Sequence, residues 1–396
     1  MTLDDWLADI QARHHRQWDL GLDRVGEVGR RLGVLSPAPH IFLIAGTNGK
    51  GSACEMISCL LAEKGLKVGK STSPHLVRFN ERIVIDGCAV SDETIIDAFS
   101  TIRQAAGDVS LSYFEYGALA SMYIFRQAGV DAAVLEIGLG GRLDAMNIVD
   151  PDVSVITRIA LDHQDWLGDT RELIAVEKAG VMRTGKPCVI ADEDPPQALA
   201  DCAARLGTPL RFINASLEFA LSPDCPLPEP SLRAAIEAVL ARGFVLSGEE
   251  VVAALGRLHL PGRFQILKSP RRTLLDVAHN PDAAAWLAQR LAKLHYRSCH
   301  AVFGIYADKD LDSVVACLAP LVDHWYLAAM PEPRAADTGL LEQSVIRLGG
   351  SVRGKYDMVL AAYDSASANA HDDDLILVFG SFGIVGPVLE HLGDGV

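Results

Sequence analysis

Short apolar runs alternate with helical stretches along most of the chain. This alternation is typical of parallel α/β architecture, in which a helix follows each strand and packs on the sheet. In the first part of the chain the runs predict strands at Pro39–Ala45, Ala132–Ile137, Val153–Thr157 and Pro187–Ala191. Later runs predict strands at Thr273–Val277, Ala301–Ile305, Trp325–Ala329 and Leu375–Phe379. We therefore expect an α/β protein with two sheets, the first one mostly parallel.

Two helices stand out, one in each series of strands. The first follows a glycine-rich turn, carries Ala53, Ile57 and Leu60 on one face, and stops near Gly65. The second begins at Pro281, because proline is favoured in the first turn of a helix. The segment L-P-G-R-F separates the two series, so we expect a larger N-terminal domain over residues 1–262 and a smaller one over 263–396.

Composition and charge narrow the classes of function. A chain of 396 residues is too long for one compact core, and 49% hydrophobic with 22% charged residues is globular composition. A formal charge of −15 argues against a general nucleic-acid binder, which needs a basic face. The acidic start and the lack of a long apolar run predict neither a signal peptide nor a membrane span. Eight cysteines without a C-x-x-C pair suggest reduced thiols and a cytoplasmic protein.

Polar residues gather where the predicted strands end. A glycine turn follows the first strand, Glu136 closes the V-L-E run, and His163 follows the next strand. In the second series, Asp276 and His279 follow L-L-D-V. Open α/β sheets bind ligands beyond the carboxyl ends of their strands. We therefore expect an active site formed where one such edge of each domain faces the other.

The glycine turn predicts a phosphate-binding loop. Glycines let successive N–H groups point at phosphate oxygens, and the following helix adds its positive end. In a standard Walker A loop, four residues separate the first two glycines, and Ser or Thr follows the lysine. Here two residues separate the glycines, and a glycine follows the lysine. The expected nucleotide-binding residues are Gly46, Thr47, Asn48, Gly49, Lys50, Gly51 and Ser52.

The variant loop G-T-N-G-K-G-S resembles the folylpolyglutamate synthase/dihydrofolate synthase branch of the Mur ligase superfamily. Other stretches similar to that family follow the same order over nearly the whole chain. They are D-L-G-L-D-R-V at 19–25, T-S-P-H-L at 72–76, N-E-R-I at 80–83, F-E at 114–115, E-I-G-L-G-G-R-L-D-A at 136–145, L-D-H at 161–163, E-K-A-G at 177–180, P-G-R-F at 261–264, D-V-A-H-N-P at 276–281 and G-S-F at 380–382.

The resemblance implies a P-loop-type N-terminal domain, a Rossmann-like C-terminal domain and an ATP-dependent amide ligase. Such a ligase activates a folate-type carboxylate as an acyl phosphate and joins it to L-glutamate. The implied partners are ATP, Mg²⁺ at two sites, dihydropteroate, reduced folates and L-glutamate, without nucleic acid or membrane, and we expect a monomer. A bifunctional enzyme that acts on both dihydropteroate and reduced folates is expected, with a monofunctional folylpolyglutamate synthase as the alternative.

The same resemblance implies roles for particular residues. Ser73, Glu136 and His163 would hold a magnesium, and Lys178 would be carbamylated to hold a second one. Taken alone, Lys178 is an ordinary helical lysine for which exposure is the default, and His163 is as consistent with a core or capping role. The residues with implied catalytic roles are Lys50, Lys178, His163, Asp276 and His279.

Nucleotide and substrate contacts are also implied. Arg263 and Asp276 would contact ATP, although a hinge salt bridge and a helix cap are their structural alternatives. Lys309 would meet the incoming glutamate, and a solvated loop charge is equally consistent with its sequence. Phe114 would stack on a flat pterin ring, or else belong with Tyr113 to the core. The implied pterin-binding residues are Asp19, Leu20, Gly21, Ser112, Tyr113, Phe114, Glu115, Leu143, Asp144 and Ala145.

Three departures from the family pattern concern individual contacts. Met146 stands where the family usually has Thr, and Ser231 stands near a place where an Asn often faces adenine. Gly383 stands where the pattern G-S-F-H-T-V has a histidine. These departures affect details of nucleotide and glutamate binding rather than the class of reaction.

Other functions fit the sequence less well. The stretch Gly138–Gly141 suggests a dinucleotide fingerprint, but the position of its third glycine holds Leu143. A peptidoglycan Mur ligase would need a UDP-binding domain before the loop, where 45 residues precede Gly46. A P-loop kinase or GTPase disagrees with the spacing of the loop. A non-catalytic nucleotide-binding protein would lack glutamate-dependent ATP hydrolysis.

Overall fold

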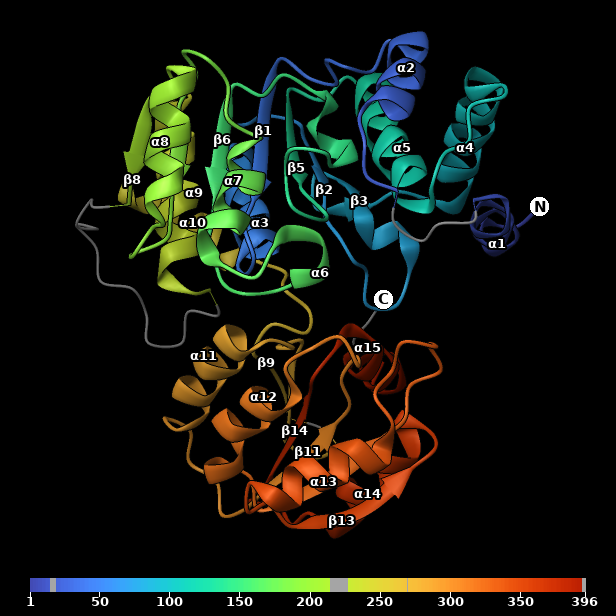
Figure 1. Ribbon diagram of the computed structural model, residues 1–396, viewed down its shortest axis with the longest axis vertical. Helices are drawn as coiled ribbons and strands as arrows, with labels where there is room; N and C mark the ends of the chain where they lie inside the picture. The colour runs from blue at the N-terminus through green and yellow to red at the C-terminus, as the bar shows by residue number, and fades with distance from the viewer. Residues whose placement is uncertain (15–18, 214–226, 269, 394–396) are drawn as a thin grey trace. The chain divides into compact units, whose positions relative to one another are not determined.

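The chain divides into two compact units, Met1–His259 and Leu260–Val396 (Figure 1). The computed structural model describes residues 1–14, 19–213, 227–268 and 270–393. The division follows His259, whereas the sequence suggested a boundary after residue 262. Each unit has its own sheet flanked by helices, which agrees with the expected α/β class.

Unit 1 is built on an eight-stranded sheet. Its strands, in spatial order, are β4 (Cys88–Ala89), β3 (Ile83–Ile85), β2 (Val68–Ser71), β5 (Ala132–Glu136), β1 (His40–Ala45), β6 (Val153–Ile156), β7 (Cys188–Ile190) and β8 (Leu210–Phe212). The pairs β2–β3 and β3–β4 are antiparallel, and the other neighbours are parallel. The carboxyl ends of β5, β1 and β6 therefore meet at one edge of the sheet.

The helices of unit 1 pack on this sheet because side chains alternate along each strand. Ile41, Leu43 and Ala45 of β1 belong to one continuous core, so Phe42 and Ile44 face the other side. The helices are α1 (Leu3–Arg13), α2 (Asp23–Leu32), α3 (Lys50–Glu63), α4 (Asp92–Ala106), α5 (Tyr113–Ala128), α6 (Gln164–Leu167), α7 (Arg171–Ala179), α8 (Gln197–Leu206), α9 (Glu229–Ala241) and α10 (Gly248–Gly256), with 3-10 turns η1 (Phe79–Arg82) and η2 (Ala145–Ile148).

Unit 2 has a six-stranded sheet. Its order is β13 (Val352–Tyr356), β12 (His324–Ala328), β11 (Cys299–Phe303), β14 (Leu375–Phe379), β10 (Thr273–Asp276) and β9 (Gln265–Leu267), with only β9 antiparallel to its neighbour. Its helices are α11 (Pro281–Leu291), α12 (Leu311–Leu318), α13 (Thr338–Arg347), α14 (Val359–Asn369) and α15 (Phe382–His391), with the turn η3 (Ala319–Leu321). The core lies between this sheet and its helices.

All eight predicted strands exist, and their ends differ from the predicted ones by at most two residues. The seven cysteines in the described part of the chain are free thiols, and Cys225 lies outside it. Over the described ranges, no helix has the length and apolar character that crossing a bilayer requires.

Candidate active site

At two positions of the glycine turn after β1, only glycine fits. At Gly46, with φ +148°, a Cβ atom would lie 1.7 Å from Thr157 Oγ1. At Gly49, with φ +87°, it would lie 2.6 Å from Ser231 Oγ. Any side chain at either position would displace the loop from its supports. Ser231, near which the family places a base-contacting Asn, therefore lies against the loop itself.

Hydrogen bonds fix the turn to the segment that follows β6. The Thr47 N–H donates to the Arg158 carbonyl at 2.7 Å, and Thr157 Oγ1 donates to the Asn48 carbonyl at 2.8 Å. Thr47 Oγ1 lies 3.1 Å from both the carbonyl and the N–H of Ala160. Helix α3 begins directly afterwards at Lys50, so its first N–H groups point to this turn. The result is a hydrogen-bonded turn at the start of a helix, a geometry that suits an anion and is called the anion cradle below.

Two lysine side chains meet at one carbonyl of this cradle. Lys50 Nζ donates to the carbonyls of Gly46 and Thr47 at 3.1 and 3.2 Å. Lys178 Nζ donates to the same Gly46 carbonyl at 2.8 Å, and Lys178 is only 3% exposed. The default expectation of an exposed helical lysine is therefore wrong. Burial, and then repulsion from Lys50, lower the pKa of Lys178 to about 7.

Close backbone packing brings Lys178 into the core. The loop after β5 passes directly over the end of α7, where the Arg142 N–H donates to the Glu177 carbonyl at 2.9 Å. A Cβ atom at Gly141 would lie 2.8 Å from the Glu177 carbonyl oxygen, and one at Gly180 would lie 2.4 Å from the Cα of Arg142. Glycine at both positions therefore lets the two motifs E-I-G-L-G-G-R and E-K-A-G touch, which buries the lysine between them.

Glu136 places a carboxylate beside the same loop. It ends β5, the neighbour of β1, and is only 5% exposed. Its Oε2 accepts a hydrogen bond from the Ser73 N–H at 3.0 Å and lies 3.8 Å from the position of a Cβ atom on Gly51. The backbone of Ser73 and the carboxylate of Glu136 are thus in contact, and the carboxylate is the kind of oxygen ligand that Mg²⁺ prefers.

His163 lies directly before the short helix α6. It is partly exposed, has φ +51° and precedes α6 as its N-cap, while its N–H donates to Asp162 Oδ1 at 2.9 Å. The charge of Asp162 acts on Lys178 and opposes the lowering of its pKa. The L-D-H motif therefore lies next to Lys178, and His163 occupies the N-cap position of α6 without a capping hydrogen bond from its side chain.

The donor set suits magnesium that is bound chiefly through a nucleotide. Among the described residues, no three His, Cys, Asp or Glu side chains gather into a group able to hold a metal ion. Mg²⁺ does not require such a cage, because it commonly keeps several waters and takes one or two carboxylates plus substrate phosphates. One buried carboxylate beside a phosphate cradle fits that pattern.

The expected substrate-binding segments also come together in unit 1. The Gly21 N–H donates to the Leu143 carbonyl at 3.2 Å. Arg24 joins the other two segments: its Nη1 lies 2.9 Å from Asp19 Oδ2, and its Nη2 lies 3.2 Å from Glu115 Oε1. Arg24 was not predicted as a site residue, although the D-L-G-L-D-R-V motif contains it. Leu20 precedes Gly21 and packs partly buried against the core.

The start of α5 supplies the remaining residues expected to bind substrate. Ser112 and Glu115 form a capping box, in which the Ser112 N–H donates to Glu115 Oε2 at 2.7 Å. Tyr113 and Phe114 are only partly buried, and both pack on the core. The Phe114 ring lies 2.5 Å from the place that a Cβ atom on Gly138 would take. Both aromatics therefore pack on the core, as the alternative interpretation expects, and remain partly exposed.

Asp144 serves the loop that carries Leu143 and Ala145. It accepts hydrogen bonds from the N–H groups of Leu139 and Met146, each at 2.9 Å. Full burial raises the pKa of Asp144 to about 7, and these N–H groups oppose that rise. Ala145 and Met146 lie buried in η2 immediately after it. Asp144 therefore holds the loop in shape, and Met146 fills core space.

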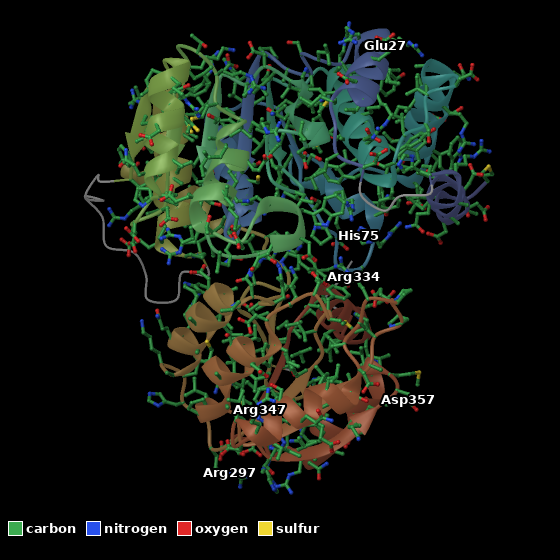
Figure 2. All side chains as sticks on the ribbon, in the orientation of Figure 1. Glu27, His75, Arg297, Arg334, Arg347 and Asp357 are labelled. Atoms are coloured by element: carbon green, nitrogen blue, oxygen red, sulfur yellow. The ribbon has the colours of Figure 1, made fainter. Side chains whose placement is uncertain are left out.

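Two further residues at this edge went unassigned in the sequence, although motifs contain them. Arg82 Nε donates to His75 Nδ1 at 2.8 Å, and the guanidinium lies over the rings of Phe79 and Tyr113 at 5.4 and 5.6 Å. Burial, and then the charge of Arg82, lower the pKa of His75 to about 4. Figure 2 shows His75 at one end of unit 1 and Glu27 of α2 at the other end. A neutral imidazole here leaves Arg82 as the local positive charge.

In unit 2 the three motifs P-G-R-F, D-V-A-H-N-P and G-S-F form one cluster. Asp276 accepts hydrogen bonds from the N–H groups of Phe264 and Ala278 at 2.9 and 2.8 Å. Burial raises the pKa of Asp276, and the charge of Arg263 opposes this rise. The Arg263 guanidinium lies 5.0 Å from the centroid of the Phe382 ring.

His279 and Lys309 also lie at the carboxyl ends of the strands of unit 2. His279 Nδ1 is 2.8 Å from the Val277 carbonyl, and its ring lies 6.4 Å from that of Phe382. Asn280 caps α11. Only 4% of the Lys309 side chain is exposed, with Asp308 at 3.8 Å, so the alternative of a solvated loop charge is wrong.

Most of the chain is similar to known Mur ligase domains. Residues 44–208 match the model of the Mur ligase middle domain, and residues 262–382 match that of the Mur ligase glutamate ligase domain. The dihydrofolate synthase/folylpolyglutamate synthase of Escherichia coli is 41% identical over 98% of this chain and 95% of its own length.

Solved structures show the same likeness over the whole chain. E. coli FolC in complex with DHPP and ADP has a TM-score of 0.93 and 40% identity, covering 100% of this chain and 98% of that one. A bifunctional folylpolyglutamate synthase/dihydrofolate synthase with Mn, AMPPNP and L-glutamate bound has a TM-score of 0.92 and 41% identity, covering 99% and 98%.

Proposed function

Because the chain belongs to the dihydrofolate synthase/folylpolyglutamate synthases of the Mur ligase family, we propose that it adds L-glutamate both to dihydropteroate and to reduced folates. It is an ATP-dependent ligase that forms a carbon–nitrogen bond. The carboxylate of the acceptor would first take the γ-phosphoryl group of ATP, and the amine of glutamate would then displace phosphate from the acyl phosphate. We place this activity in a cytoplasmic monomer with small-molecule partners.

The observation that carries the proposal is the anion cradle with two lysines on one carbonyl. Two anions must approach each other for a carboxylate to attack a phosphate, so positive charge has to lie where they meet. Lys50 and the first N–H groups of α3 supply it from a single turn of chain. Gly46–Ser52 is therefore proposed to bind the triphosphate.

Divalent metal is proposed to bind beside this cradle. Ser73 and Glu136 would hold one Mg²⁺, with His163 as a third ligand, and bound Mg²⁺ would neutralise charge on the phosphate oxygens. For a second Mg²⁺, Lys178 would become a carbamate: its neutral amine adds CO₂ and releases one proton. Burial of Lys178 supports this step because it favours the neutral amine.

Unit 2 is proposed to contribute Arg263, Asp276 and His279 as nucleotide-contacting and catalytic residues, and Lys309 as a contact for glutamate. The clustering of their motifs at the carboxyl ends of β10, β11 and β14 supports this assignment. The pterin is proposed to bind in unit 1, where the segments around Asp19, Phe114 and Asp144 meet.

Replacing Arg24 with Met should raise the KM for dihydropteroate about tenfold and leave the KM for ATP unchanged. Arg24 holds Asp19 and the buried Glu115 together, and truncating one partner of such a pair costs about 1–3 kcal/mol. Steady-state kinetics with each substrate varied in turn would measure this. Arg30→Met, on the exposed face of α2, is the matched control. Equal changes in both KM values would contradict a role limited to the pterin side.

A two-substrate assay tests the proposed function itself. Purified protein with Mg-ATP and L-glutamate should release phosphate when given dihydropteroate, and also when given tetrahydrofolate. Turnover with tetrahydrofolate alone would establish the alternative, a monofunctional folylpolyglutamate synthase. Release that does not depend on glutamate would overturn the assignment as a ligase.

A further inference from the structure

Two loops of unit 2 are joined at the carboxyl edge of its sheet. The loop after β11 and the loop after β12 pair through a bridge between Tyr306 and Ala335. The Ala307 N–H donates to the Arg334 carbonyl at 2.9 Å, and the Ala336 N–H donates to the Ile305 carbonyl at 2.9 Å. Figure 2 shows Arg334 and Arg297 at opposite ends of this unit. The joined loops therefore form a fixed surface at the end of the unit where ligands of α/β sheets bind.

Glu332 of this surface lies beside the glycine that departs from the family pattern. A Cβ atom on Gly383 would lie 3.1 Å from Glu332 Oε1, 3.4 Å from Oε2 and 3.1 Å from Met330 Sδ. Ser381, the N-cap of α15, donates to Met330 Sδ at 2.9 Å and so holds that side chain in place. The space next to position 383, where the family usually carries an imidazole, thus borders a carboxylate and a thioether.

The carboxylate of Glu332 is not fully satisfied. Within the described part of the chain, its Oε2 atom is buried and has no hydrogen-bond partner. Leaving a buried charged oxygen unpaired costs free energy, so such an atom in a binding surface is a candidate for pairing with a ligand. Positive groups lie on the same two loops, with the Arg334 guanidinium 3.7 Å from the Tyr306 ring and Lys309 beside Asp308.

The negative charge of Glu332 determines which ligand group can pair with its Oε2 atom. The triphosphate and the acceptor carboxylate are anions, which a carboxylate repels. L-Glutamate also has two carboxylates, which suit Arg334 and Lys309, but its amino group is a cation at neutral pH. We propose that Glu332 binds the ammonium group of the incoming L-glutamate and takes the place of the family's histidine as a specificity residue. This inference rests on the proposed function.

The test compares L-glutamate with glutarate, which keeps both carboxylates and lacks the amino group. In the Glu332→Gln variant, the KM for L-glutamate should rise about ten- to hundredfold, as expected when a hydrogen bond to a charged group is weakened. The inhibition constant of glutarate, measured by competition with L-glutamate, should stay within about twofold of wild type, and so should the KM for ATP. The wild-type preference for L-glutamate over glutarate would thereby collapse.

A structural role for Glu332 would give another result. If Glu332 only stabilises the end of α15, L-glutamate and glutarate would weaken together and the melting temperature would fall, which would overturn the proposal. An unchanged KM for L-glutamate would overturn it as well. Glu390→Gln, an equal change of charge at an exposed position of α15, is the matched control and should leave every constant unchanged. The wild-type assay with dihydropteroate and tetrahydrofolate tests the ligase function independently, so failure of one does not imply failure of the other.

Discussion

Lys50→Ala should lower turnover about a thousandfold or more, the scale expected when a positive group on a transferring phosphoryl group is removed. Lys50 is the first residue of α3 and its Nζ is held over the loop by the carbonyls of Gly46 and Thr47. Removing it leaves the cradle's N–H groups in place but takes away the positive charge of the side chain. We expect kcat to fall much more than the affinity for the folate substrate, because that substrate is proposed to bind elsewhere in unit 1.

Three measurements separate loss of charge from loss of fold. Phosphate release gives kcat, calorimetry with ADP gives nucleotide affinity, and thermal denaturation should show a melting temperature close to that of wild type. Lys186→Ala removes an equal charge from a surface pair with Asp150 and should keep normal turnover. Near-normal turnover of Lys50→Ala would mean that the triphosphate binds away from Gly46–Ser52.

The sequence predicts the architecture well because burial on both faces makes central strands continuous apolar runs. β1, β5, β11 and β14 are of this kind, and each was predicted. β2 was not predicted, because its sequence V-G-K-S holds a glycine and a lysine. The structure explains both: a Cβ atom on Gly69 would collide with the Phe125 ring at 2.6 Å, and Lys70 pairs with the buried Glu55. The edge strand β13 was not predicted either, because its sequence V-R-G-K-Y also holds a glycine and a lysine.

The glycine turn between β1 and α3 could also be predicted, because strand, turn and helix adjoin in sequence. Burial of Lys178 could not, because it depends on contact between segments far apart in the chain. The only local signal was glycine at positions 141 and 180, where the two backbones touch. Glu332 illustrates the same limit. Its neighbour Gly383 is distant in sequence, so an absent imidazole gave no indication of which group stands beside it.

Lys178→Met should abolish most turnover and yet stabilise the folded protein. Its ammonium group is buried and close to Lys50, and its pKa is lowered to about 7 from an ordinary value of 10.5. Burying a side chain whose charged form is disfavoured lowers the free energy of unfolding by about 1.4 kcal/mol per unit of pKa shift. Methionine has a similar length and carries no charge, so the free energy of unfolding should rise by a few kcal/mol, while a proposed metal ligand is lost.

The pH dependence of stability distinguishes the removal of a disfavoured charge from better packing by methionine. Between about pH 10.5 and about pH 7 the unfolded chain binds a proton at Lys178 and the folded chain does not. Wild-type stability should therefore fall as the pH is lowered through this window, and below about pH 7 this contribution should be constant. The stabilisation by Lys178→Met should accordingly be larger at pH 7 than at pH 9. Denaturant titrations in buffer depleted of CO₂ would measure it without carbamylation.

The turnover of the wild-type enzyme should depend on how much of Lys178 is in the neutral amine form. Wild-type turnover should increase as the pH rises through about 7, and added bicarbonate should increase it further, because the uncharged amine is the form that adds CO₂. Labelled bicarbonate should give a carbamate signal by NMR in wild type and in Lys186→Met, and none in Lys178→Met. Turnover that ignores bicarbonate, together with no carbamate signal, would leave Lys178 as an ammonium group that supports the loop through Gly46. A normal rate for Lys178→Met would exclude that role too, because no charge or ligand atom would remain at the position.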